Sequence, residues 1–535
     1  MRTFDSAARA AVQKVIDDNN ALLAATSGFV AAEPGFPVVN GAVLREPAII
    51  VFVAHKRPED SVLAEDRAPR QIGLYRVAVM QASPERQLAA AAAKDQALDL
   101  VAAAIAESAE GLTYEPPADG LIDQEYEVSQ PLLCHLGPDA GWPVLRPFLE
   151  AAEATLSVAI YDFNADYVAK TFIECVRKPG FAGALTWDDS MTAAETEIRK
   201  RLRAVANLNG VIVQCGGGRR FASAYHEKVA VRDSSAFWLS SGNWSLRSQP
   251  NIDPVGVPAQ AKGMYAKGNR EWHVIVEDEE LSKQFELYIK HDLKGSQEEA
   301  QAGDTGAVLE AAESLRMPDL FVPLEELQRA AVVAASVAEP TAPASLPSDG
   351  STFTIQPLLT PDNYVGRITR ELKKVRRSVY LQFAYINYSE KAADREFREM
   401  LQVLADLSWK PGIDVRIIVG SNDAADKIRV LAEAGFNDKV FRRQSNVHNK
   451  GIVFDGSRVL ISSANWSGDG VLRNRDAGLL VFNREVAQYY QTAFRQDWDE
   501  RASSLLEDDM PVLLAREGEP TPEGMVRMSW RDYYS

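Results

Sequence analysis

Apolar and polar residues follow the same order in two long stretches of the chain, and this order predicts a duplicated unit. Each stretch opens with Gln-Pro-Leu-Leu, beginning at Gln130 and at Gln356, and then alternates helix patterns with apolar strand patterns. Strands are expected at 156–161, 211–214 and 274–276 and at 378–383, 415–419 and 479–482; helices at 142–154 and 281–289 and at 364–375 and 485–498. Strands that alternate with helices predict an α/β sheet covered on both faces. We therefore expect two α/β units packed about a pseudo-twofold axis.

The segments outside the repeat divide the chain further. Strand patterns at 48–53 and 75–80, between helix patterns at 8–23 and 88–105, predict a small N-terminal α/β accessory domain of unknown role. Helix patterns at 308–315 and 324–338 lead into a linker rich in Pro and Ala. The expected division is an accessory domain at 1–125, a first unit at 126–294, a helical and Pro/Ala-rich linker at 295–351, a second unit at 352–510 and a tail at 511–535.

Composition indicates the cellular compartment that we expect for the protein. The 535 residues are 46% hydrophobic and 25% charged, and no apolar run approaches the length of about eighteen residues that would indicate a membrane-spanning helix. The start of the sequence lacks the apolar core of a secretory signal. Three scattered cysteines provide neither a zinc site nor a disulfide framework. These features predict a cytoplasmic protein without a metal ion or another cofactor.

The net charge of −17 argues against a nucleic-acid partner, but the charge is unevenly distributed. Residues 365–485 contain 21 Lys and Arg against 15 Asp and Glu, with a dense basic run at 370–377. The second unit should therefore attract anionic substrates. The basic run itself is also explained by a solvated helix face.

Two copies of one short pattern carry the candidate chemistry. The first copy comprises His226, Lys228, Asp233, Ser240, Ser241 and Asn243, and the second comprises His448, Lys450, Asp455, Ser462, Ser463 and Asn465. An Asn-Arg-acid tripeptide follows each copy and ends at Glu271 and at Asp476, 28 and 11 residues after the motif asparagine. A histidine can attack phosphorus through one ring nitrogen when the other is held by an acceptor. A lysine two residues later on a strand lies on the same face. The identical offsets predict two matched halves of one site.

The pattern resembles the signature of the phospholipase D superfamily, His-x-Lys-x4-Asp-x6-Gly-Ser-x-Asn, in both copies. Ser240 and Ser462 stand where that family has glycine, which we interpret as a mild change. The resemblance implies two duplicated phospholipase D-like α/β domains that form one catalytic site, and a phosphodiesterase that needs no metal. The alternative is an inactive relative that acts only as a binding scaffold, although both copies are complete.

The resemblance also implies a two-step displacement. One histidine, expected to be His226, attacks phosphorus and forms a phosphohistidine, and the other, His448, acts as acid and base. The phosphate oxygens are expected to be held by Lys228, Lys450, Asn243 and Asn465, with support from Ser241 and Ser463. The histidines are expected to be oriented by Glu271 and Asp476. A structural role is expected for Asp233 and Asp455.

The substrate is left open between phospholipids and nucleic acids. Two halves in one chain favour phospholipid head groups slightly, with peripheral membrane contact and no required oligomer. Trp244 and Trp466 follow the motif asparagines and could stack on bases, so a metal-independent nuclease is the alternative. The same tryptophans could equally lie in the core. The inserted loop between Trp244 and Asn269 contains apolar residues such as Met264 that could meet a lipid surface, or it is a plain surface excursion.

Overall fold

Two eight-stranded sheets form the centre of the computed structural model, which describes residues 3–92, 112–189, 192–302, 318–324, 339–506, 510–516, 518–530 and 533. The first sheet contains β8 (Leu132–Gly137), β9 (Thr155–Ile160), β10 (Ala182–Asp188), β11 (Leu208–Val213), β12 (Lys228–Arg232), β13 (Ala236–Ser240), β14 (Glu271–Val276) and β16 (Ala344–Leu346). The second contains β7 (Tyr126–Val128), β17 (Phe353–Thr360), β18 (Ser378–Phe383), β19 (Asp414–Gly420), β20 (Phe441–Gln444), β21 (Lys450–Phe454), β22 (Arg458–Ser462) and β23 (Asp476–Phe482). The mixed α/β fold expected from the sequence is confirmed.

The two sheets have corresponding strand orders, β11-β10-β9-β12-β13-β14-β8-β16 and β20-β19-β18-β21-β22-β23-β17-β7. This correspondence corrects one match made from the sequence, which paired 211–214 with 415–419. In the structure β19 corresponds to β10, and β11 corresponds to β20. The pattern missed β10 because its first residues are Ala and Gly, and it missed β20 because two arginines interrupt this short strand.

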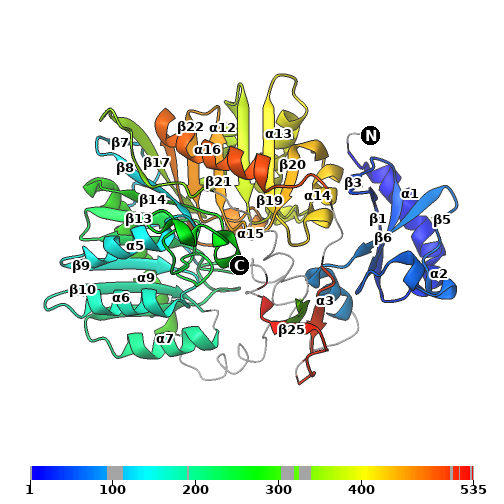
Figure 1. Ribbon diagram of the computed structural model, residues 1–535, viewed down its shortest axis with the longest axis horizontal. Coiled ribbons are helices and arrows are strands. Elements are labelled where there is room, and N and C mark those ends of the chain that lie inside the picture. Colours follow the sequence, from blue (N-terminus) through cyan, green and yellow to red (C-terminus); the bar gives the residue numbers. More distant parts are fainter. Residues whose placement is uncertain are drawn as a thin grey trace.

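Helices cover both faces of each sheet (Figure 1). The outer faces pack against α5 (Gly141–Glu150) and α6 (Asp166–Val176) in the first half, and against α12 (Tyr364–Lys373) and α13 (Arg395–Ser408) in the second. The inner faces share one buried core with α9 (Glu279–Ala302) and α16 (Arg484–Glu500). Helix α9 continues past residue 294, where the sequence placed the end of the first unit. The shared core joins the two halves through their inner faces.

Each sheet takes an edge strand from the sequence that precedes the other half. Strand β7 comes before β8 in the chain but pairs antiparallel with β17, in the second sheet. Strand β16 comes before β17 and pairs antiparallel with β8, in the first sheet. Residues 126–128, which the sequence assigned to the first unit, therefore belong to the second sheet. The two halves are interlocked as well as packed.

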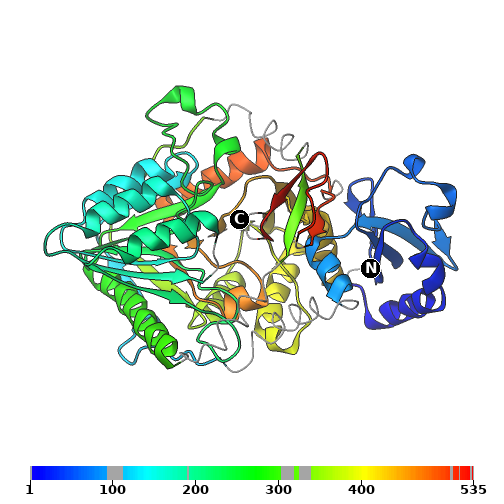
Figure 2. The same ribbon diagram turned by 90° about the horizontal axis from the view of Figure 1, so that it is seen from below.

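The N-terminal domain contains a separate four-stranded sheet at one end of the molecule (Figure 2). Its strands are β1 (Phe29–Gly35), β4 (Ala48–Val53), β5 (Gln71–Ile72) and β6 (Tyr75–Gln81), and its helices are α1 (Ser6–Asp18), α2 (Asn20–Ala24) and α3 (Pro84–Ala92). Strands β4 and β6 were predicted and β1 was not. Helix α3 covers the start of the predicted helix 88–105. The rest of that helix, the predicted helix at 308–315 and, apart from Leu324, the predicted helix at 324–338 lie outside the described residues.

A buried ionic network fixes this domain to α14 (Ala424–Glu433) of the second half. The guanidinium of Arg429 is buried and donates to Glu33 of β1 over 2.6 Å and to Asp426 over 2.8 Å. Arg86 of α3 bridges the same two carboxylates at 2.7 and 2.8 Å. Because breaking a buried ion pair leaves an uncompensated charge, this network holds the domain in one position.

The predicted linker and tail pair with each other. Strand β15 (Asp319–Pro323) lies between β24 (Leu513–Ala515) and β25 (Met525–Met528) in a three-stranded antiparallel sheet. Gln87 of α3 donates to the carbonyl of Val512 over 2.6 Å, which ties this small sheet to the N-terminal domain. None of the helices in the described ranges is long and apolar enough to cross a membrane.

Candidate active site

The two motif histidines lie just before equivalent central strands, β12 and β21, and meet at the interface between the halves. His226 and His448 are buried, with 6% and 4% of their surfaces exposed. Backbone hydrogen bonds cross the interface beside them: His226 N donates to Arg475 O over 2.7 Å, and His448 N donates to Arg270 O over 3.2 Å. The structure thus brings both motif copies to one place.

Each histidine is paired with the acid of the opposite half. His226 Nδ1 lies 2.7 Å from Asp476 Oδ1, and His448 Nδ1 lies 2.8 Å from Glu271 Oε1. A carboxylate at Nδ1 fixes the tautomer and leaves Nε2 as the reactive nitrogen. Each acid is the last residue of its Asn-Arg-acid tripeptide and the first residue of β14 or β23, so the crossing arises where these strands begin at the interface.

The second serine of each motif binds a carboxylate. Ser241 Oγ donates to Glu271 Oε2 over 2.6 Å, and Ser463 Oγ donates to Asp476 Oδ1 over 2.7 Å. Ser248, in the first-half insertion, adds a bond of 2.8 Å to Glu271. In the structure these hydroxyls hold the acids in place, whereas the sequence assigned Ser241 and Ser463 to the phosphate.

The first serine of each motif shapes the turn after its strand. Ser240 Oγ accepts from Gly242 N over 2.7 Å, and Ser462 Oγ accepts from Ala464 N over 3.0 Å. The change from the family's glycine is thus more than a tolerated substitution, because the hydroxyl satisfies a buried N–H group. A Cβ atom on Gly242 would come within 2.8 Å of the Glu271 carboxyl carbon, so an alanine here, as at Ala464 in the second copy, would displace the Glu271 side chain.

Lysine and asparagine side chains complete the site. Lys228 and Lys450 are fully buried, and each Nζ donates to the carbonyl of its own motif histidine, over 2.6 and 2.5 Å. Lys450 Nζ also lies 2.9 Å from His448 Nε2. Asn243 Oδ1 and Asn465 Oδ1 are buried without a hydrogen-bond partner among the described residues. Cations and amides beside Nε2 form a suitable environment for an oxyanion.

The two acid–histidine pairs differ in their electrostatics. Burial alone would raise the pKa of Glu271, but His448, Lys450 and Ser241 hold it at about 2. Burial raises the pKa of Asp476 to about 7 although Lys228 opposes the rise. Burial also lowers the pKa of His448 to about 4 and that of Lys450 to about 7. These shifts favour an ionised Glu271 and a His448 that loses its proton readily, whereas the Asp476 side retains a proton more readily.

Asp233 and Asp455 hold the strand that lies beside each motif strand. Both have positive φ, 52° and 53°, in the turn after β12 and β21. Asp233 accepts from the backbone N–H groups of residues 153–155, and Asp455 accepts from those of residues 376–378. These contacts are structural and fix the start of β9 and of β18.

The sequence reasoning missed a second crossed pair behind the histidines. Arg270 donates to Asp497 over 2.8 Å, and Arg475 donates to Asp292 over 2.7 Å, with all four side chains fully buried. Each arginine precedes a motif acid, and each aspartate, on α16 or α9, lies 21 residues after the acid of its own half. This shared offset was the available signal. It places one buried ion pair from each half across the interface.

The positions of Trp244 and Trp466 contradict the expectation that they could stack on nucleic-acid bases. Trp244 and Trp466 are fully buried and pack on Phe163 and Phe383 at ring distances of 4.9 and 4.7 Å. They are core residues and cannot stack on bases. Tyr161 instead lies beside the site, with its ring 4.6 Å from that of His226.

One expectation for the loop inserted between Trp244 and Asn269 in the first half was contact with a lipid surface through apolar residues such as Met264, and the structure places Met264 differently. Met264, in the short helix α8 (Met264–Lys267), and Tyr265 are buried against the protein. Tyr265 receives a hydrogen bond from Arg270, and Arg247 donates to Asn446 over 2.6 Å, two residues before His448. Leu246 and Val257 are its exposed large apolar residues. The insertion therefore packs against the second half beside the histidines.

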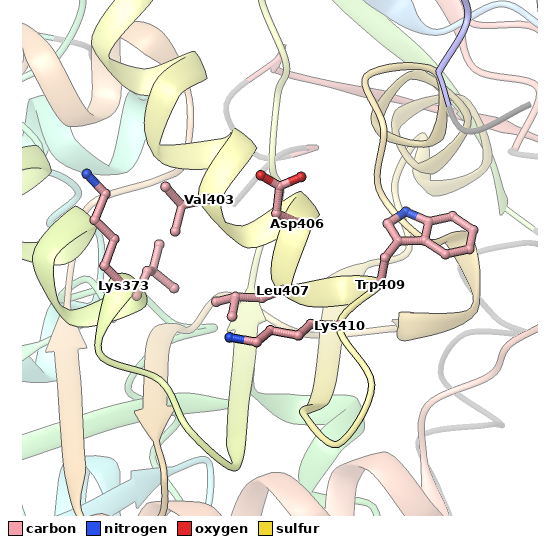
Figure 3. Close-up of a pocket in the computed structure, with 7 residues that line it drawn as sticks. Lys373, Val403, Asp406, Leu407, Trp409 and Lys410 are labelled. Carbon is pink, nitrogen blue, oxygen red and sulfur yellow. The ribbon is translucent and has the colours of Figure 1, made fainter.

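The basic run at 370–377 lies away from the catalytic residues. Lys373 borders a hollow of about 400 Å³ between α12 and α13, with Val403, Asp406, Leu407, Trp409 and Lys410 on its other side (Figure 3). None of the motif residues lines this hollow. Lys374 pairs with Glu371 at 2.7 Å, and the side chain of Arg370 is exposed. The contacts are those of a solvated helix face. In the described ranges, no three His, Cys, Asp or Glu side chains are placed to hold a metal ion.

Comparison with known proteins finds a family model that matches part of the second half. Residues 368–498 match the family model described as "Cardiolipin synthase, PLD-like domain". Over 92 residues the chain is 30% identical to the mitochondrial cardiolipin hydrolase of Xenopus tropicalis, a match that spans 17% of this chain and 44% of that relative. The resemblance to the phospholipase D superfamily is confirmed, and the second half contains a phospholipase D-like domain.

Two solved structures align with parts of the chain. Phosphatidylserine synthase from Haemophilus influenzae Rd KW20 aligns with a TM-score of 0.43 and 11% identity, over 70% of this chain and 90% of that one. The phospholipase D family member Nuc from Salmonella typhimurium aligns with a TM-score of 0.23 and 15% identity, over 28% of this chain and 97% of that one.

Proposed function

We propose that this chain, whose second half contains a phospholipase D-like domain, is a phosphodiesterase that acts on phospholipid head groups. The observation that carries the proposal is the crossed pairing of His226 with Asp476 and of His448 with Glu271. Two histidines with fixed tautomers, beside two buried lysines, are suited to attack a phosphodiester and to protonate its leaving group.

The reaction would proceed in two displacements. Nε2 of one histidine attacks phosphorus, and the P–O bond to the leaving group breaks as the other histidine transfers a proton to that oxygen. The second histidine then removes a proton from water or an alcohol, whose oxygen attacks phosphorus and breaks the P–N bond. Lys228, Lys450 and the motif asparagines would stabilise the negative charge that develops on the other oxygens.

The roles of the two histidines are open to a direct test. The family resemblance favours His226 as the nucleophile. The electrostatics favour the reverse, because burial lowers the pKa of His448 to about 4 and keeps it unprotonated. Substrate labelled at phosphorus, followed by a denaturing quench at alkaline pH, should leave the label on one histidine. Label on His226 matches the resemblance, and label on His448 matches the electrostatics. Label on neither, without transfer to an added alcohol, would contradict the covalent mechanism.

A phospholipid substrate has the better support. The relative is named as a cardiolipin hydrolase and the family model as a cardiolipin synthase domain. The burial of Trp244 and Trp466 removes the feature that favoured a nuclease. A basic surface, which nucleic-acid binding ordinarily requires, is not indicated by the net charge of −17.

The proposal is tested by assaying cardiolipin, phosphatidylcholine, single-stranded DNA, duplex DNA and RNA with matched variants. His226→Ala and His448→Ala should each lower phospholipid turnover by about a thousandfold or more, the effect of losing a nucleophile or a general acid. His291→Ala, on α9 outside the site, is the control and should retain activity. Turnover of nucleic acid alone would replace the proposal with a nuclease, and turnover of no diester would leave a binding scaffold.

A further inference from the structure

A cavity of about 730 Å³ lies in the N-terminal domain, separate from the catalytic residues. It is bounded by the face of β4 and β6 on one side and by the loop of residues 55–70 on the other. Its volume is within the range of about 300–1,000 Å³ that is typical of small-molecule sites. The candidate chemistry of the sequence does not involve these residues.

The mouth of this cavity is basic in an otherwise acidic protein. Four cationic side chains line it, Lys56, Arg57, Arg67 and Arg70, against two acidic ones, Glu59 and Asp66. Glu59 is already paired with Arg70 at 2.8 Å. The net charge of the chain is −17, so a local excess of positive charge would attract an anion to this face.

Two of the arginines retain hydrogen-bonding capacity for a ligand. Arg57 donates to Ser27 Oγ over 2.7 Å, and Arg67 donates through Nε to the carbonyl of Val62 over 2.9 Å. A guanidinium carries five N–H donors, so these contacts orient each group and leave other donors. Both side chains are exposed at the mouth of the cavity. They are placed to contact an anionic head group.

Part of the cavity wall is aliphatic, beside the polar residues Thr26, Ser27 and His55. Val53 of β4, Val77 and Val79 of β6, and Val62 and Met510 from flanking segments line it. Val77 and Val79 are only half-buried, although they are apolar residues on a sheet. Among the described residues that line the cavity, no Phe, Tyr or Trp is present for stacking on a base. An aliphatic chain therefore suits the interior better than a nucleobase.

We infer that this cavity binds an anionic amphiphile, a ligand with an anionic head and a single aliphatic chain. The head would contact Arg57 and Arg67, and the chain would cover Val77 and Val79. The ionic network of Arg429 holds the domain on the second half, and Met510 and Pro511, which follow that half in the chain, form part of the wall. The ligand would thus bind where the N-terminal domain meets residues 510–511, outside the catalytic site.

Calorimetric titration of the full chain with dilute lysophosphatidic acid and with oleate tests this inference without any turnover. Saturable binding of one or both is expected, and the two probes distinguish a phosphate head from a carboxylate head. Arg57→Glu combined with Arg67→Glu should weaken binding by about tenfold or more, because both changes replace an attractive charge with a repulsive one. Val77→Asp should also weaken binding of the amphiphile, because it places a charge where the aliphatic chain would lie.

The controls separate this site from the catalytic one. Arg76→Glu reverses an exposed charge on β6, the strand of Val77 and Val79, but Arg76 does not line the cavity. This variant should leave binding unchanged. Phospholipid turnover should be unchanged in the Arg57→Glu, Arg67→Glu variant. The inference fails if neither amphiphile saturates, if lysophosphatidylcholine or AMP binds as tightly, or if Arg76→Glu weakens binding as much as the double variant.

Discussion

At the scale of single residues, the proposed chemistry depends on Glu271 and Asp476, the acids that reach each histidine from the opposite half. Replacing Glu271 with Gln or Asp476 with Asn keeps the shape of the side chain but replaces a carboxylate with an amide, which can impose the wrong tautomer on the histidine. We expect each change to lower turnover by about a thousandfold or more, as for the acid of other His-centred sites.

Glu277→Gln is the matched control for these two changes, because the side chain lies just past the end of β14 and is 65% exposed. Steady-state rates on the same phospholipid are the measurement. Activity of Glu271→Gln within tenfold of wild type would contradict an orienting role for this acid.

The buried side chain of Glu227, which follows His226 in the chain, leads to a separate prediction about the stability of the protein. Glu227 accepts a hydrogen bond from Tyr225 over 3.2 Å, and burial raises its pKa to about 8 from the ordinary 4.5. Because the folded state binds the proton more tightly, its contribution to stability is complete below about pH 4.5. It is lost as the pH rises through about 8.

Glu227→Gln removes this ionisation and should therefore stabilise the protein at pH 9 and change little at pH 5. The expected gain at pH 9 exceeds about 1.4 kcal/mol, the equivalent of one pKa unit. Urea denaturation at both pH values is the measurement, and Glu197→Gln on the exposed face of α7 (Ala193–Arg203) is the control. Equal effects of Glu227→Gln at the two pH values would contradict the assignment.

At the scale of elements, α9 and α16 fasten each half to the other through Asp292 and Asp497. Asp497→Asn removes one of two buried carboxylates beside the Arg270 guanidinium, the other being Asp139 at 2.7 Å, so the cost should lie at the lower end of the about 3–5 kcal/mol for breaking a buried pair. We expect a loss of stability of that order in urea denaturation. Asp499→Asn, on the exposed side of the same helix, should cost less than about 0.5 kcal/mol. Similar losses in the two variants would show that the pair does not contribute.

The same elements show what the sequence could predict. Strands rich in β-branched residues, such as β4, β18 and β19, were recognisable from their pattern. The edge strand β20 was not, because the sheet supplies its backbone partners whatever its side chains. The motif offsets predicted a set of residues that the structure brings together. They could not predict that Glu271 serves His448, since the crossing depends on how two folded halves face each other.

At the scale of the whole molecule, the proposed mechanism relies on cations from the chain itself. Lys228 and Lys450 would supply the positive charge that a divalent metal provides in other phosphodiesterases, and Lys450, whose pKa burial lowers to about 7, would hold its proton more firmly beside a bound phosphate. We therefore expect full activity in excess EDTA. Loss of turnover in EDTA, with recovery on adding back one divalent metal, would contradict this mechanism. A mild loss that no metal restores would leave it intact, and the His226→Ala variant gives the background rate.

Because each sheet takes an edge strand, β7 or β16, from the sequence that precedes the other half, the two halves should be less soluble when they are expressed as separate polypeptides. A polypeptide that ended before β16 would leave β8 as an uncovered sheet edge, and one that began after β7 would leave β17 uncovered in the same way. Exposed edges pair readily with foreign chains. Expressed apart, the halves would therefore tend to aggregate, and co-expression should rescue solubility because each fragment carries the strand that the other lacks.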